Sequence, residues 1–386
     1  MQTFTYENPT RVHFGKGVIG RLGDELKAMG AKRVLLVYGK GSLKASGVYD
    51  AISAQLAAAG VHVVEHAGVS GNPLLSHVRV GIELVRNEQV DTICAAGGGS
   101  VMDESKAIAA GALASGDVWD FFCGKGAPTR MLPLLTICTL PATGSEMNGI
   151  CVVTNEETRQ KSALVKPGIL NPLISFLDPE TTMSLSPTQT AYACTDILSH
   201  VMEAYFTTTA LRLPLQDNLM EGVCRATTEA MASIISNPAD YKARATFMWS
   251  ATMAWSGIIQ AGIPAPSMPC HALEMPISGV YNVAHGAGLS IVIPAWLEIM
   301  GEQHKARIAQ FTKTVLGENC THTIKAGEMF RRYYRLIGSP VTFKDAGIES
   351  PDLDLLTGLA AEAFAQRGMN DYSTDVIRKI YNACVS

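Results

Sequence analysis

Four residues in the C-terminal half of the chain form a set that suits a divalent metal ion. Asp196 and His200 are four positions apart, a spacing that puts both side chains on one face of a helix. His271 and His285 complete the set. Three imidazoles and one carboxylate offer the mixed ligands that Fe(II), Zn(II), Ni(II) and Mn(II) accept, unlike a thiolate-rich structural zinc site. Each histidine alone is typical of a core or surface residue, so the hypothesis depends on all four together and on a nucleotide-binding half upstream.

A glycine-rich turn in the N-terminal half predicts where a nucleotide binds. The turn comprises Gly97, Gly98, Gly99 and Ser100. An apolar run over residues 90–96 precedes it, and a helical pattern over 101–108 follows. A strand that turns through glycines into a helix lets backbone N–H groups approach a pyrophosphate. Ser100 and Asp103 also fit a capping box at that helix start. The alternative is a tight turn without a ligand, because the run is not the fingerprint GxGxxG.

Several further motifs lie along the whole chain, and their order matches that of one known family. They are residues 14–17, 97–103 with Lys106, 140–146, 177–180, 196–205 and 271–285. The chain resembles the iron-containing, or group III, alcohol dehydrogenase family, and within it the branch of NADPH-dependent aldehyde reductases and butanol dehydrogenases. The resemblance implies that the divalent metal, Fe(II) first and Zn(II), Ni(II) or Mn(II) as alternatives, is held by Asp196, His200, His271 and His285.

The resemblance also implies residues that contact the cofactor. A loop after a strand offers hydroxyl and backbone donors from Thr139, Leu140, Thr143 and Ser145, although such a loop is also ordinary turn chemistry. Lys161 resembles the family lysine that approaches the nicotinamide ribose, with an exposed surface lysine as the alternative. Asp103 either caps its helix or faces the cofactor. Leu185 and Thr188 are expected at the adenosine end.

The chemistry that these residues imply is hydride transfer between NADP(H) and an aldehyde or primary alcohol. The cofactor supplies the hydride, and a divalent metal with one open coordination position polarises the carbonyl or alkoxide oxygen. A small-molecule aldehyde or alcohol is therefore the expected partner. The family resemblance further implies a homo-oligomer, a dimer or larger.

The coenzyme preference is predicted from the end of the strand over residues 33–38. NAD-preferring relatives carry an aspartate there, which accepts from the ribose 2′-hydroxyl and would repel a 2′-phosphate. Here the position is Gly39, and Gly41 and Ser42 follow with Lys40 between them. Backbone amides, a hydroxyl and a cation favour a phosphate. We expect a preference for NADP(H), with equal use of NAD(H) as the alternative.

Composition excludes several other classes. The chain has 386 residues, 47% hydrophobic and 17% charged, enough for two domains with sizeable cores. A net charge of −4 gives no electrostatic reason to expect nucleic acid or an anionic membrane as a partner. Nine scattered cysteines without a CxxC pair are typical of a reducing compartment, and the first residues do not form a signal peptide. We expect a cytoplasmic enzyme.

The pattern of elements predicts the fold class. Strands near 33–38, 61–64 and 90–96 alternate with helices near 48–59 and 75–87, which indicates βαβ units and a parallel sheet. Further strands are expected at 135–140, 149–154 and 173–177. After Ser186-Pro187-Thr188-Gln189, a helix-start pattern, almost every segment is helical. We expect an α/β, Rossmann-like, dinucleotide-binding domain over residues 1–185, followed by an all-α metal-binding and catalytic domain over 186–386.

Alternatives of the same fold stay open at this point. Dehydroquinate synthase is a lyase that also uses NAD and a metal, but that family has a glutamate with two histidines and basic phosphate-binding residues. NAD-linked glycerol or polyol dehydrogenases are closer. A degenerate member with little turnover is a third alternative, because Met275 stands where many relatives have a second histidine one turn after His271.

Overall fold

The computed structural model describes residues 1–208 and 213–385, which form two compact units. The sheet unit comprises Glu7–Leu185 and Ala239–Thr252. The helical unit comprises the described residues of Met1–Tyr6, Ser186–Pro238 and Met253–Ser386. The chain therefore passes from the sheet unit to the helical unit after Leu185. Two short segments depart from a single boundary: Met1–Tyr6 belongs to the helical unit, and Ala239–Thr252 belongs to the sheet unit.

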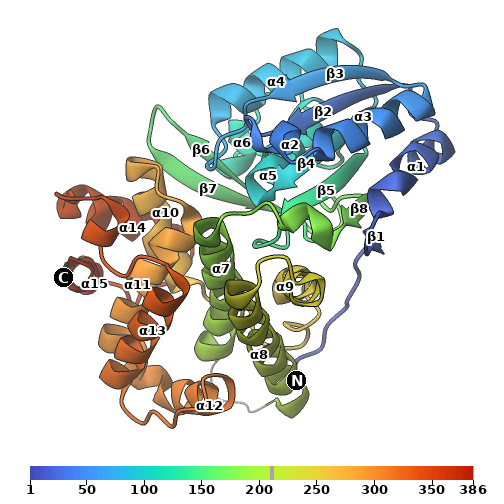
Figure 1. Ribbon diagram of the computed structural model, residues 1–386. Helices are drawn as coiled ribbons and strands as arrows, with labels where there is room; N and C mark the ends of the chain where they lie inside the picture. Colours follow the sequence, from blue (N-terminus) through green and yellow to red (C-terminus); the bar gives the residue numbers. More distant parts are fainter. Residues whose placement is uncertain (209–212, 386) are drawn as a thin grey trace. The chain divides into compact units, whose positions relative to one another are not determined.

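A parallel sheet of six strands forms the centre of the sheet unit, in the order β1-β8-β5-β4-β2-β3. The strands are β1 (Arg11–Phe14), β2 (Arg33–Tyr38), β3 (His62–Ala67), β4 (Thr92–Gly98), β5 (Leu134–Leu140) and β8 (Ile174–Leu177). From β2 the chain moves outward to β3, returns past β2 to β4, and continues on the other side through β5 (Figure 1). The direction of winding reverses between β2 and β4. The parallel sheet, with a helix between successive strands, confirms the predicted α/β fold class.

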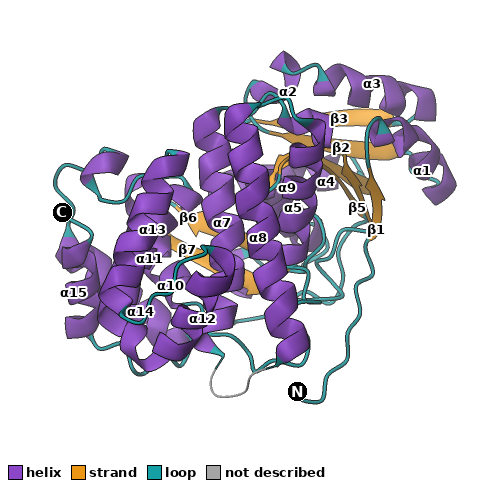
Figure 2. Cartoon of the chain, turned by 60° about the horizontal axis from the view of Figure 1, so that its bottom comes forward, coloured by secondary structure: helices purple, strands orange, loops and turns teal. Residues whose placement is uncertain are grey.

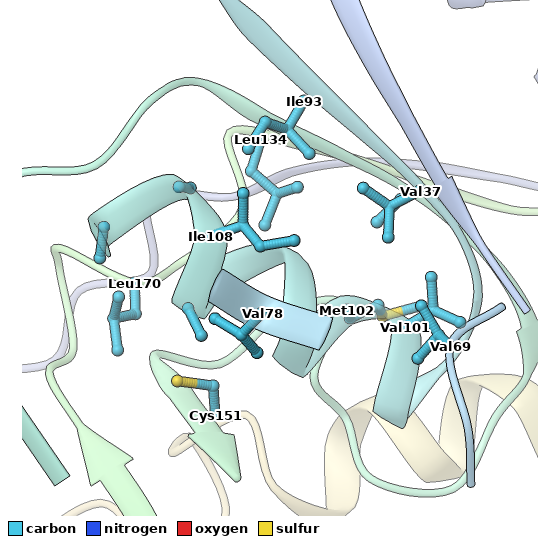
Figure 3. Packing of buried hydrophobic residues seen from close by; sticks show 14 of the residues in the cluster. Val37, Val69, Val78, Ile93, Val101, Met102, Ile108, Leu134, Cys151 and Leu170 are labelled. Atoms are coloured by element: carbon cyan, nitrogen blue, oxygen red, sulfur yellow. The ribbon is translucent and has the colours of Figure 1, made fainter. Parts of the chain in front are cut away.

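Helices cover both faces of the sheet because the strands are apolar on both faces. The covering helices are α1 (Leu22–Met29) and α3 (Val48–Ala59) on one face, and α4 (Leu75–Asn87) and α5 (Gly99–Gly111) on the other. On β2, Val34 and Leu36 pack toward α3, while Val37 packs in the cluster that contains Val78 and Ile108 (Figure 3). Continuous burial of this kind is what a parallel strand between two helical layers requires.

Two strands were not expected from the sequence. β1 is a short edge strand with a partly exposed surface, and β7 (Gln160–Val165) has three polar residues followed by three apolar ones, without alternation. β7 pairs antiparallel with β6 (Ile150–Asn155) in a separate two-stranded sheet. Neither strand shows the apolar run that marks the buried strands.

The helical unit contains the remaining long helices. They are α7 (Pro187–Thr207), α8 (Pro214–Ser236), α10 (Pro269–Tyr281), α11 (His285–Met300), α12 (Lys305–Val315), α13 (Thr323–Ile337), α14 (Leu353–Gln366) and α15 (Thr374–Ala383). The central helix is α11, which is almost completely buried and packs against α7, α10, α13 and α15 (Figure 2). No helix in the described part of the chain is long and apolar enough to cross a membrane.

Short elements and α9 complete the chain. They are η1 (Val18–Arg21), α2 (Ser42–Ala45), α6 (Trp119–Phe122), η2 (Pro179–Thr182), α9 (Tyr241–Ala254), η3 (Gly301–His304) and η4 (Lys344–Ala346). Most of α9 belongs to the sheet unit, where Thr252 donates a hydrogen bond of 2.5 Å to buried Glu146.

The two predicted helix starts have different outcomes. At α7 the capping box is present: Ser186 Oγ accepts from Gln189 N at 3.1 Å, and the Gln189 side chain accepts from Ser186 N at 3.2 Å. The capping box of Ser100 and Asp103 is wrong. Because β4 extends to Gly98, α5 begins at Gly99, and Ser100 Oγ instead donates to Gly71 O at 2.5 Å.

Candidate functional site

The helical unit brings the four predicted metal ligands together. Asp196 and His200 lie on successive turns of α7, His271 lies in the first turn of α10, and His285 begins α11. Asp196 Oδ1 is 3.5 Å from His200 Nδ1 and 3.7 Å from His285 Nε2. The His271 ring centroid lies 4.9 Å from that of His200 and 5.1 Å from that of His285. Residues from three helices thus converge at one point.

The atoms at this point fit a cation. Among the described residues, Asp196 Oδ1, His200 Nδ1 and His271 Nε2 are buried without a hydrogen-bond partner. Potential ligand atoms of these three residues lie within 4.8 Å of one another. Buried polar atoms are normally hydrogen-bonded, so three unpaired ones that converge need another partner, which a metal ion would supply. Burial lowers the pKa of His200 to about 3 despite the opposing charge of Asp196, which keeps its imidazole in the neutral form that binds metals.

Glu203 hydrogen-bonds the imidazole of His271 on the side opposite the other ligands. This α7 carboxylate is 2% exposed and hydrogen-bonds His271 Nδ1, while Cys270 N also donates to it. Burial acts to lower the pKa of His271, but the charge and hydrogen bond of Glu203 outweigh it and raise that pKa. With Nδ1 fixed in this way, His271 Nε2 is left facing the other ligands. Carboxylates behind metal-binding histidines commonly set ring orientation and basicity.

Glu274 holds His285 in the same manner, and sequence reasoning missed it. The fully buried carboxylate hydrogen-bonds His285 Nδ1 and accepts from Ser278 Oγ. A Cβ at Gly288 would lie 2.7 Å from Glu274 Cγ, so a glycine on α11 is what lets the carboxylate fit beneath the histidine. No helical spacing indicates this contact, because Glu274 lies on α10, 11 positions before His285 on α11.

Met275 lies on α10 one turn after His271. Its side chain is 7% exposed, and its sulfur is 3.0 Å from Arg367 Nη2. The position therefore presents an apolar surface with a cation behind it, where a histidine would present a proton donor.

In the sheet unit, the two predicted glycine-rich turns follow neighbouring strands. Gly39 comes directly after β2, and Gly97 and Gly98 end β4, at the point where the winding reverses. Nucleotides bind α/β sheets outside the carboxyl ends of the strands at such a point. The α5 helix begins here without a side-chain cap and without an acidic residue in its first turn, as far as the described residues go. Its first N–H groups remain suited to an anion.

Close packing joins the glycine turn to the predicted loop over residues 139–145. A Cβ at Gly99 would lie 2.5 Å from Thr143 Oγ1, and one at Gly98 would lie 3.1 Å from Leu140 Cβ. Thr139 and Leu140 end β5, which pairs with β4. The structure therefore brings Gly97–Ser100 together with Thr139, Leu140 and Thr143.

Asp103 and Ser145 bond to each other instead of pointing away from the protein. Asp103 accepts from Ser145 Oγ at 2.6 Å and from Val152 N at 3.0 Å. Lys106 Nζ donates to Ser145 Oγ at 2.8 Å and to Ile150 O at 2.8 Å. Burial raises the pKa of Asp103 against the opposing effect of Lys106, and burial lowers the pKa of Lys106 to about 8.

The other predicted cofactor residues lie around this network. Lys161 lies on β7 opposite Thr154 of β6, and Val152 of that same strand β6 donates to Asp103. Gly41 and Ser42 form the start of the short helix α2. Leu185 follows η2. Thr181 of η2 donates a 2.9 Å hydrogen bond from its hydroxyl to Cys138 O of β5.

Comparisons with known proteins agree along nearly the whole chain. Residues 9–179 match the family model described as iron-containing alcohol dehydrogenase, and residues 190–385 match the C-terminal model of the same family. A probable NADH-dependent butanol dehydrogenase from Bacillus subtilis is 38% identical over 93% of this chain and 94% of its own length. NADPH-dependent aldehyde reductase YqhD from Escherichia coli is 32% identical over 99% and 100%. The solved structure of NADH-dependent butanol dehydrogenase A from Thermotoga maritima matches with a TM-score of 0.95 at 35% identity, covering 100% of this chain and 99% of that one.

The Glu274–His285 pair generates a prediction about metal affinity. Glu274→Gln keeps the shape of the side chain but removes the charge that supports His285, so metal binding should weaken by roughly 10–100-fold. Competition with a chromophoric chelator measures the affinity. Glu302→Gln is the matched control, because this carboxylate is exposed in the same unit. An unchanged affinity in folded Glu274→Gln protein would show that Glu274 does not tune the site.

Proposed function

This chain belongs to the iron-containing alcohol dehydrogenase family, and on that premise we propose that it reduces aldehydes to primary alcohols, reversibly, with NADP(H) and a divalent metal. The observation that carries the proposal is the convergence of buried, unpaired ligand atoms on Asp196, His200 and His271 beside His285. A second feature supports it: two buried carboxylates orient two of these imidazoles. A site built for hydrogen bonding alone would not leave these atoms unpaired.

In this proposal each residue has a defined task. Asp196, His200, His271 and His285 hold the metal, and Glu203 and Glu274 fix the ring orientation of two ligands. A bound divalent ion supplies Lewis-acid polarisation of the substrate oxygen, and a bound nicotinamide supplies the hydride. The apolar side chain of Met275 excludes water from the wall beside His271.

The cofactor cradle is assigned to the loops of the sheet unit. Backbone groups of Gly97, Gly98, Gly99 and Ser100 receive the pyrophosphate, supported by the uncapped start of α5. The second loop contributes Thr139, Leu140 and Thr143. Asp103 and Ser145 act through their mutual hydrogen bond by holding this loop, and Lys161 approaches the nicotinamide ribose. Gly39, Gly41, Ser42 and Leu185 serve the adenosine end.

The lyase and polyol dehydrogenase alternatives are not favoured. Matching relatives include proteins named as butanol dehydrogenases and an aldehyde reductase. A degenerate member is also not favoured, because all four expected ligands are present and converge. Fe(II) is our first choice of metal, with Zn(II), Ni(II) or Mn(II) as alternatives, since the ligand set accepts each of them.

Assembly and location complete the proposal. We infer a homo-oligomer, a dimer or larger; exposed apolar side chains such as Leu336, at 75%, and Leu215, at 64%, are consistent with surfaces that a second copy would cover. We also infer a cytoplasmic location, which is supported by the nine cysteines, all of them free thiols.

The activity itself is tested with butanal as the probe. Metal-loaded protein should oxidise NADPH in the presence of butanal, and His271→Ala should lose tight metal binding and turnover while it still binds NADPH. Metal content, initial rates and a fluorescence titration with NADPH measure the three properties. His322→Ala, at an exposed position of the same unit, is the control. Stoichiometric metal and normal rates in His271→Ala would show that the ligand assignment is wrong.

Coenzyme preference gives a second test. Wild-type protein should have a higher kcat/KM with NADPH than with NADH, and Gly39→Asp should shift the ratio toward NADH because a carboxylate repels a 2′-phosphate. The substitution has room, since the nearest atom to a Cβ at Gly39 is Val69 O at 3.7 Å. Gly20→Asp, at another open position of the sheet unit, controls for added charge. A wild-type preference for NADH contradicts the assignment.

Met275 gives a third test. We expect the wild-type protein to reduce small aldehydes without a histidine here, and Met275→His to change the rate by no more than about 10²–10⁴-fold. The nearby Arg367 cation should lower the pKa of the new histidine, because like charges disfavour protonation. Rates across pH measure both effects, and Met275→Leu controls for loss of the sulfur. Activity in Met275→His with none in metal-loaded wild type would support a decayed site instead.

A further inference from the structure

A second group of metal-ligating side chains lies in the sheet unit, outside the site described above. It consists of His66 at the end of β3, His77 on α4 and Glu104 on α5. Glu104 Oε1 is 3.1 Å from His66 Nε2 and 2.6 Å from His77 Nδ1. The two rings are stacked, with centroids 4.1 Å apart and planes 24° from parallel. We call this group the His66–His77–Glu104 cluster.

One carboxylate oxygen of the cluster is buried without a partner. Glu104 is 0% exposed, and its second oxygen, Oε2, has no hydrogen-bond partner among the described residues. His66 is 3% exposed, so water is largely excluded. Both imidazoles face one carboxylate oxygen and leave the other unpaired, which is costly for a buried charge.

The backbone around the cluster is arranged to allow this close approach. A Cβ at Gly81, on α4, would lie 3.1 Å from His66 Nε2 and 2.3 Å from Ile108 Cδ1. A larger residue there would have to displace the side chains of Ile108 and His66. Glycine therefore leaves room for the imidazole of His66 to lie between β3 and α4.

We propose that His66 Nε2, His77 Nδ1 and Glu104 bind a second divalent ion of the zinc type. Two imidazole nitrogens and a carboxylate form a ligand set that zinc uses widely, usually with water in the fourth position. The side chain of His77 is 29% exposed, which gives the ion a route from solvent. The ion satisfies the carboxylate and joins β3, α4 and α5, and Glu104 directly follows Asp103 of the loop-holding network.

The inference does not depend on the proposed function, because its ligands belong to the sheet unit and share no residue with the first site. Its test counts zinc ions bound to the full chain after chelator treatment and zinc titration, by metal analysis and by competition with a chromophoric chelator. Wild type should bind two ions per chain and His271→Ala one. His77→Phe, which retains a ring to stack on His66, should bind one, and the double variant none.

Matched variants keep the outcome decisive. Glu104→Gln should also lose one ion, and circular dichroism shows whether each variant is folded. His62→Phe, at an exposed position on the same strand β3, should still bind two. The same number of ions in wild type and in folded His77→Phe and Glu104→Gln would overturn the proposal and leave the cluster as a hydrogen-bonded group only, whether or not the first site binds zinc.

Discussion

The arrangement of the helical unit depends on two buried carboxylates that must be partnered. Removing a carboxylate from water costs several kcal/mol in a protein interior unless hydrogen bonds replace the solvent. Glu203 meets this requirement with a backbone amide at the start of α10 and with His271. Glu274 meets it with Ser278 and His285. The start of α10, the start of α11 and the orientation of two imidazoles are therefore consequences of the same constraint.

Helix packing adapts to this constraint through glycine. A Cβ at Gly286 would lie 2.1 Å from Tyr192 O, so only glycine lets the first turn of α11 lie against the backbone of α7. That contact brings His285 within 3.7 Å of Asp196. Without it the carboxylate and the fourth histidine would sit on helices too far apart to share an ion.

Sequence reasoning succeeded where one element contains the whole signal. The i, i+4 spacing of Asp196 and His200 and the capping box at Ser186 are local, and both appear in α7. The parallel sheet followed from the alternation of apolar strands and helices. Family resemblance, not spacing, joined His271 and His285 to the first pair.

Sequence reasoning failed where a contact joins separate elements or where a strand lacks an alternating pattern. β7 was missed because its pairing with β6, not its composition, makes it a strand. The cap expected at Ser100 was wrong because pairing with β5 extends β4 to Gly98. No local spacing indicates the His66–His77–Glu104 cluster, because Glu104 is 38 positions from His66 and 27 from His77 along the chain.

The enclosed ammonium of Lys106 has a consequence for how a nucleotide would associate. Its four oxygen contacts are to Ser145 Oγ, Asn148 O, Asn148 Oδ1 and Ile150 O. These contacts fix the segment from Ser145 to Ile150 in the protein alone. The conformational entropy of that segment is lost during folding, at about 1–2 kcal/mol per residue, and is not lost again when a ligand arrives. Association therefore resembles the docking of rigid surfaces more than the ordering of a loop.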